Sequence, residues 1–206
     1  MGILSGALTA RRYRVDGDVP IGFREGFAES LRSYAFQDKS SPTAGEELAG
    51  WVEIHNLLDV GFEDINRWLY DHYAIFSLRV DKRVLPAKLF KAHLEKRVEA
   101  WCQENQRSKC PAAVRGELKE LLEFEMLQKT LPRVSVYEVC WNVTDGWLLF
   151  HNISDRANER FVKLFFETFG LHPKPEAPLD LLGSDEELGE AMLCTGGLDY
   201  RPEVDA

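Results

Sequence analysis

The residues best suited to chemistry in this sequence are lysines and arginines, which concentrate in its middle part. Residues 79–133 hold 13 basic and 8 acidic side chains, whereas the rest of the chain holds 12 and 26. The 206-residue chain therefore has a formal net charge of −9 although this stretch is +5. An acidic total argues against a uniformly basic nucleic-acid binder, but a local positive surface attracts polyanions. The same pattern also fits solvated helix faces, in which Lys91 and Glu95 would pair across one turn.

Motifs for catalysis or cofactor binding are missing from the sequence. It has no phosphate-binding glycine loop, no nucleophile elbow and no paired-histidine zinc motif. The four cysteines lack metal-ligand or redox spacing and are expected to be free thiols, and the five histidines are scattered. A metal-dependent nuclease stays open as a weaker hypothesis, because one predicted helix is rich in carboxylates, namely Glu117, Glu120, Glu123 and Glu125. We expect no cofactor and no bound metal.

Hydrophobic periodicity predicts the elements that must position these side chains. Residues 73–80 alternate between apolar and polar positions, as in a half-buried strand. Pro86 and Pro111 each suit the first turn of a helix, and Phe161, Leu164 and Phe165 define an apolar stripe. The predicted order is strand 7–15, helix 20–36, strand 50–54, strand 73–80, helices 86–106 and 111–129, strands 134–144 and 147–152, and a helix from Ser154 or Asp155 to 169.

A β-hairpin is the most specific local prediction. Asp145 and Gly146 suit the two central positions of a type I′ turn, where both residues have positive φ. With these two as the loop, Val143 would pair with Leu148, and Trp141 with Phe150. One face of the hairpin would then be aromatic and aliphatic.

The predicted elements indicate an α+β fold in which an antiparallel sheet has helices packed on one face, including a long helical pair. Residues 1–175 would form this domain. Residues 176–206 are acidic and contain glycine and proline, so we expect an extended or mobile tail with at most a short helix over 184–193. No signal peptide and no apolar run of the roughly 20 residues needed to span a membrane is found, so an intracellular protein without membrane association is expected.

Several motifs, in order along residues 3–175, resemble the bacterial recombination-associated protein family RdgC. Residues 83–98, RVLPAKLFKAHLEKRV, are similar to its K-I-L-P … I-K-x-x-L-E-x-K-I segment. Residues 50–52 match its G-W-V, and residues 131–133 match its L-P-R after a leucine-rich helix. Trp141 and Gly146 resemble its W-x-D-T-x-N-G hairpin with one residue fewer between them. The ordered set, rather than any single motif, carries the resemblance.

The resemblance implies a non-enzymatic DNA-binding protein of the nucleoid. Proteins of this family form a dimer that closes into a ring around duplex DNA with little sequence preference, and they restrain the RecA recombinase. The chain departs from the family at two points. It lacks about a third of the usual length of near 300 residues, at the C-terminal end, and Ser135 stands where the family has phenylalanine two residues after the L-P-R arginine.

Together these observations predict a cytoplasmic, nucleoid-associated homodimer that binds duplex DNA nonspecifically, with a RecA-type recombinase as a further partner. The alternative is a protein-interaction or assembly module that no longer encircles DNA. The first hypothesis requires the basic side chains to form one open surface for phosphates. The resemblance places Arg133 on the arginine of L-P-R, and Lys82, Arg83, Lys88 and Lys91 in the basic segment around I-L-P. The full set of predicted DNA-binding residues is Lys82, Arg83, Lys88, Lys91, Arg115, Lys119, Arg133, Arg12 and Arg14.

Overall fold

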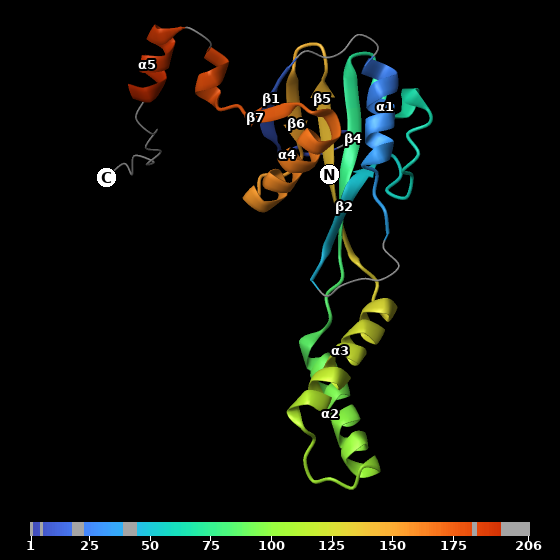
Figure 1. Ribbon diagram of the computed structural model, residues 1–206. Coiled ribbons are helices and arrows are strands. Elements are labelled where there is room, and N and C mark those ends of the chain that lie inside the picture. The colour runs from blue at the N-terminus through green and yellow to red at the C-terminus, as the bar shows by residue number, and fades with distance from the viewer. Residues whose placement is uncertain (1, 5, 18–22, 39–44, 183–184, 195–206) are drawn as a thin grey trace, which may run out of the picture.

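The computed structural model describes residues 2–4, 6–17, 23–38, 45–182 and 185–194. Most of them form an α+β fold, in which one antiparallel sheet carries helices on one face (Figure 1). The strands are β1 (Arg11–Asp16), β2 (Glu47–Val52), β3 (Leu69–Tyr70), β4 (Tyr73–Lys82), β5 (Arg133–Asn142), β6 (Trp147–Phe150) and β7 (His172–Pro175). The α-helices are α1 (Phe23–Ser33), α2 (Ala87–Glu104), α3 (Ala112–Lys129), α4 (Asp155–Phe169) and α5 (Glu186–Cys194), and 3₁₀ helices span Ile65–Arg67 and Pro178–Leu182.

The sheet has seven strands in the order β2-β4-β5-β6-β1-β7, with β3 paired to β4. Every pair is antiparallel. β4 and β5 are the longest strands and pair along ten residues each, and both are internal strands of the sheet. The predicted strands and helices are therefore confirmed in type and order, while β3 and β7 were not predicted. Residues 20–22, where the first helix was expected to begin, lie outside the described residues.

The predicted register of the β5–β6 hairpin is wrong by two residues. Trp141 pairs with Leu148, and Val139 pairs with Phe150. The turn has four loop residues rather than two, because the Asn142 side chain accepts hydrogen bonds from the backbone of Thr144 and Asp145. Only Gly146 has positive φ in this turn. A shift of two residues keeps each side chain on its original face, so Trp141 and Phe150 still enter the core.

The core lies between the sheet and the helices α1 and α4. Its largest buried side chains are aromatic, and Trp141 packs against both Phe27 of α1 and Phe165 of α4. Helix α4 begins as expected: the Ser154 side chain accepts a hydrogen bond from the Ala157 N–H. It ends at Gly170, which adopts the left-handed conformation that favours glycine.

Helices α2 and α3 lie beyond one end of the sheet, as an insertion between the two longest strands β4 and β5 (Figure 1). They pack against each other through buried residues that include Leu94, Leu122 and Leu127. The predicted helical pair thus exists, but it extends away from the sheet instead of covering it. The molecule is therefore elongated along the direction of β4 and β5.

The opposite face of the sheet is partly covered by the segment that follows α1. The Phe36 N–H donates a hydrogen bond of 3.0 Å to the Trp51 carbonyl, and the Arg79 guanidinium lies 4.1 Å from the centre of the Phe36 ring. Arg79 also donates two hydrogen bonds to the Asp81 carboxylate, at 2.9 and 2.7 Å. Both members of this ion pair are largely shielded from solvent.

The acidic C-terminal segment is joined to the sheet at its first residue. β7 pairs with β1, and the Glu176 N–H donates a hydrogen bond to the Arg12 carbonyl. Helix α5 coincides closely with the short helix predicted over 184–193, and it lies apart from the sheet (Figure 1). Residues 195–206 of the predicted tail lie outside the described residues. The division of the chain at residue 175 stays a prediction.

Candidate anion-binding pocket

A cationic pocket opens between the end of the sheet and the first turns of α4. Its volume is about 210 Å³. Four basic side chains and one carboxylate line it, which gives a local net charge of +3. Hydroxyl groups also face it. The charged and hydroxyl-bearing lining residues are Glu47, Lys82, Arg133, Ser135, Tyr137, Ser154, Arg156 and Arg160.

Glu47 of β2 holds three of the four cations. Its carboxylate accepts hydrogen bonds from Lys82 Nζ at 3.0 Å and from Arg156 Nη2 at 2.7 Å, both on Oε1. Arg160 Nη2 donates to Oε2. One negative charge is therefore shared by three positive ones, and the positive charge around Glu47 exceeds what a single carboxylate neutralises.

Arg133 is the fourth cation, and β-sheet pairing places it in the pocket. It is the register partner of Lys82 on the neighbouring strand, and Lys82 in turn pairs with Glu47. The three residues therefore form a row across β2, β4 and β5 on one face of the sheet. Within the described residues, no ion pair involves Arg133, and its side chain is exposed.

Burial lowers the pKa of Arg160 from its ordinary value, because the folded chain removes water from the guanidinium. The group remains charged at neutral pH, since arginine ionises far above it. A partly desolvated cation interacts more strongly with a nearby anion than a solvated one does. The pocket is therefore built to hold negative charge.

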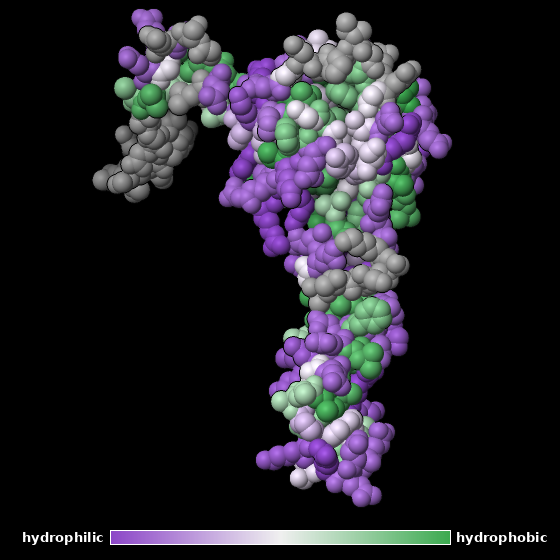
Figure 2. All heavy atoms as spheres, in the orientation of Figure 1, coloured by the Kyte–Doolittle hydropathy of each residue, from purple (hydrophilic) through white to green (hydrophobic). Residues whose placement is uncertain are grey.

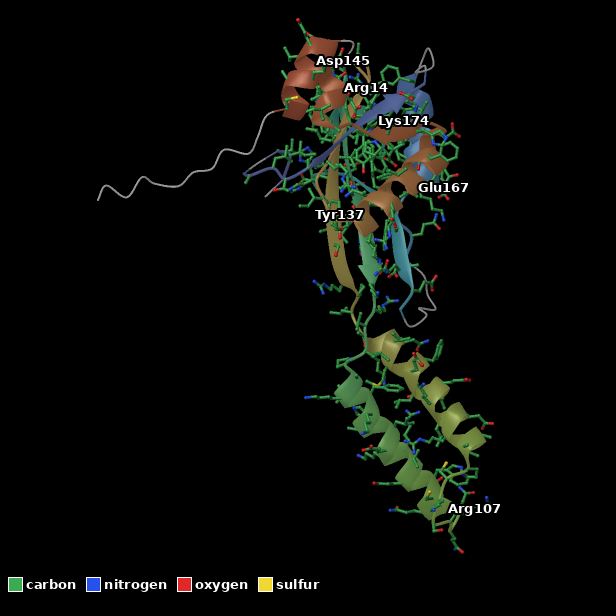
Figure 3. The ribbon with its side chains drawn as sticks, turned by 90° about the vertical axis from the view of Figure 1, so that its left-hand side faces the viewer. Arg14, Arg107, Tyr137, Asp145, Glu167 and Lys174 are labelled. Carbon is green, nitrogen blue, oxygen red and sulfur yellow. The ribbon has the colours of Figure 1, made fainter. Side chains whose placement is uncertain are left out.

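Arg12 and Arg14 lie at the other side of the sheet, on β1. Both donate hydrogen bonds to the Glu176 carboxylate, and Arg14 also donates to the Asp145 carbonyl at 2.7 Å. The Arg12 guanidinium is the main reason that the pKa of Glu176 is lowered. Arg14 and Arg107, at the tip of the helical pair, mark opposite ends of the molecule (Figure 3). The structure therefore does not bring all the predicted residues onto one surface.

The remaining predicted residues lie on or next to the helical pair. Lys91 pairs with Glu95 at 3.8 Å, and Arg83 pairs with Asp38 at 3.5 Å. Within the described part of the chain, no ion pair forms at Lys88, Arg115 or Lys119, and all three side chains are exposed. Hydrophilic and hydrophobic residues are interspersed over the surface of this pair (Figure 2).

A family model described as "Putative exonuclease, RdgC" matches residues 9–192, which is most of the chain. The chain belongs to the RdgC family. No curated protein matches it. The match confirms the resemblance noted in the sequence, and it extends past β7 into the acidic segment.

The family model is described as a putative exonuclease, and a metal-dependent nuclease would need carboxylates that converge on a metal ion. Those of α3 do not converge on a common point: Glu125 pairs with Arg97 of α2, which lowers the Glu125 pKa, and Glu117 and Glu120 are exposed. Among the described residues, no group of three or more His, Cys, Asp or Glu side chains is arranged to hold a metal ion. Within the same residues, none of the helices is long and apolar enough to cross a bilayer.

Sequence reasoning found two of the five charged residues of the pocket and missed three. Lys82 and Arg133 flank the helical pair and belong to the motifs that resemble RdgC. Glu47, Arg156 and Arg160 come from segments far from them in sequence. One local signal existed: Arg156 and Arg160 are four residues apart just after the Ser154 N-cap, so they share one face of a predicted helix.

Proposed function

We propose that this RdgC family member is a non-catalytic protein that binds duplex DNA through its phosphate backbone, without sequence preference. The pocket around Glu47 carries the proposal, because four cations converge there around a single carboxylate. Lysine and arginine contacts to phosphates give affinity but no sequence information. Membership of the family supports the same role.

The helical pair would provide a second group of contacts. Lys88, Arg115 and Lys119 are exposed and, among the described residues, form no ion pair, so they are free to meet phosphates. Lys91 and Arg83 would have to leave a carboxylate first. Arg12 and Arg14 would contribute least, because Glu176 neutralises part of their charge. DNA would therefore run along the β4–β5 direction, from the pocket toward the helices.

The proposal also covers the assembly of the protein and its role in recombination. Homodimerisation, a nucleoid location in the cytoplasm and contact with a RecA-type recombinase follow from the family resemblance. A ring around DNA would require two copies of the chain to meet through complementary surfaces. Light scattering with and without a short duplex measures both the assembly state and the change on binding.

The second candidate function is a protein-interaction module, and the helical pair favours it. Leu89, Leu121 and Phe124 are all about half exposed on its surface. Ion pairs such as Arg97 with Glu125 also reduce its positive field. Large apolar side chains that are exposed on a surface can mark a protein contact. On this hypothesis the helical pair binds protein and the DNA affinity is absent.

The deciding experiment titrates the protein onto several short duplexes of unrelated sequence over a series of salt concentrations, with fluorescence anisotropy as the readout. Four to six phosphate contacts give a slope of roughly −4 to −5 for log K against log salt. Equal affinities for all sequences are expected. No binding at low salt would leave the interaction module as the better hypothesis. Incubation of labelled DNA with protein and Mg²⁺ should leave the DNA intact, and shortened strands would show an exonuclease instead.

A further inference from the structure

The pocket around Glu47 has a floor and a rim that differ in exposure. On the floor, the side chains of Glu47 and Arg160 are 16% and 23% exposed. At the rim, the Arg156 side chain is 70% exposed and Arg133 is also open to solvent. A phosphate at the molecular surface would therefore reach Arg133 and Arg156, but only a group that enters the pocket would reach Arg160.

We propose that this pocket takes the terminal phosphomonoester of a nucleic-acid strand, in exchange for Glu47. The inference rests on the proposed DNA binding and adds a subsite to it. Glu47 is the anion that Lys82 and Arg160 share in the chain itself. A strand end would take over its hydrogen bonds from Lys82 and Arg160, and the carboxylate would turn toward solvent.

Size and access favour a strand end over an internal phosphate. A volume of about 210 Å³ is below the roughly 300–1,000 Å³ of pockets that enclose a whole small molecule, so the pocket suits a single group. An internal phosphodiester is linked to a sugar on both sides, which keep it at the surface of the duplex. A terminal phosphate has one link and three free oxygens, and can enter as far as Arg160.

Charge favours the strand end as well. The lining carries +3 with Glu47 included, and Lys82 and Arg133 are like charges in directly opposite register positions. A terminal phosphomonoester carries about −1.5 to −2 at neutral pH, whereas an internal phosphodiester carries −1. The monoester therefore neutralises more of this charge, and it offers acceptors to the hydroxyl groups of Ser135 and Tyr137.

The test compares two short duplexes that differ only in a 5′-phosphate or a 5′-hydroxyl group, by anisotropy at fixed salt. Binding of the phosphorylated duplex should be roughly tenfold tighter, about the effect of one additional charge-assisted hydrogen bond. Equal affinities overturn the inference while leaving the proposed function intact. Failure of both duplexes to bind contradicts the proposed function itself.

Two variants and a control locate the preference. Arg160→Gln should bind the two duplexes equally, because it removes the floor cation. Glu47→Gln should increase the preference, since the competing charge is gone. Lys163→Gln removes a charge from the same helix outside the pocket, where Lys163 is 79% exposed, and should keep the preference. Unchanged preference in both pocket variants, each shown to be folded by circular dichroism, places the end-binding site elsewhere and overturns the inference.

Inorganic phosphate distinguishes a strand end from a free phosphate as the ligand. If the pocket serves strand ends, millimolar phosphate should reduce the preference for the 5′-phosphorylated duplex. A rise in melting temperature with phosphate, together with equal binding of the two duplexes, would show a site for free phosphate and overturn the assignment to strand ends.

Discussion

Lys82 and Arg133 lie directly opposite each other on β4 and β5, at the point where the chain leaves the sheet for the helical pair and returns. Like charges in opposite positions of neighbouring strands destabilise a sheet. Glu47 compensates Lys82 from the other side, but the register gives Arg133 no equivalent partner. The arrangement leaves an unneutralised positive charge beside a carboxylate that already serves three cations. An anion that binds here relieves this repulsion, which is a physical reason for the pocket to have a ligand.

Arg133→Gln should weaken DNA binding by a similar factor for all sequences. Loss of one phosphate contact should reduce the magnitude of the salt slope by about 0.9. Lys163→Gln, an equal change of charge on an exposed position of α4, is the control and should have a smaller effect. The measurement is the anisotropy titration over salt. A sequence-dependent loss would indicate base contacts, and equal effects of the two variants would indicate that only net charge matters.

Glu47→Gln should separate stability from binding. The variant leaves Lys82, Arg156 and Arg160 without their common carboxylate, so the free energy of unfolding should fall by about 2 kcal/mol. DNA affinity should rise, because the internal competitor is lost. Urea denaturation and anisotropy measure the two effects, and added phosphate should restore part of the stability. A variant that loses both stability and affinity would show that Glu47 positions the cations rather than competing with the ligand.

The order of the longer strands and helices was predictable because each has a clear local pattern. The apolar stripe of α4, its Ser154 cap and its Gly170 end are all encoded within one segment. The pocket was not predictable in this way, because Glu47, Lys82 and Arg160 come together only when β2, β4 and α4 pack.

The hairpin register failed for a related reason. The Asp145–Gly146 pair favours a two-residue loop, but the Asn142 side chain hydrogen-bonds to the turn backbone and stabilises a longer one. Strand β7 was missed because its four residues include two prolines, which are poor strand formers. Pairing with the edge of β1 outweighs this local preference.

Asp81→Asn should destabilise the fold strongly. Arg79 and Asp81 form a bidentate ion pair in which the side chains are only 12% and 4% exposed. Removal of the negative charge leaves the guanidinium shielded from water without its counter-charge, at a cost of about 3 kcal/mol. The fall in the free energy of unfolding is measured by urea denaturation. Lys91→Gln, which breaks an exposed ion pair, is the control and should change stability by less than about 0.5 kcal/mol. Similar losses in both variants would show that Arg79 finds another partner.

Glu176 should make stability depend on pH in the acidic range. Hydrogen bonds from Arg12 and Arg14 hold its pKa below the ordinary value of 4.5. A carboxyl group whose pKa is lower in the folded state stabilises the protein above its unfolded pKa, and this contribution disappears as pH falls through the folded value. The free energy of unfolding should therefore decrease below about pH 4.5, and Glu176→Gln should show a smaller decrease. Parallel pH profiles for the two proteins would contradict this assignment.

Gly50→Ala should destabilise the protein because of a close backbone contact. An added Cβ at Gly50 would lie 2.4 Å from the Phe36 Cα and 2.5 Å from the Phe36 nitrogen. The segment cannot easily move away, since hydrogen bonds of 3.0 Å join Trp51 to both Tyr34 and Phe36. The free energy of unfolding should fall by about 2–3 kcal/mol. Gly116→Ala on α3, where nothing lies within 4 Å, is the matched control and should raise it by about 0.5–1 kcal/mol. Urea denaturation of the two variants checks the sign as well as the size, and a stable Gly50→Ala protein would show that the Phe36 segment is displaced at little cost.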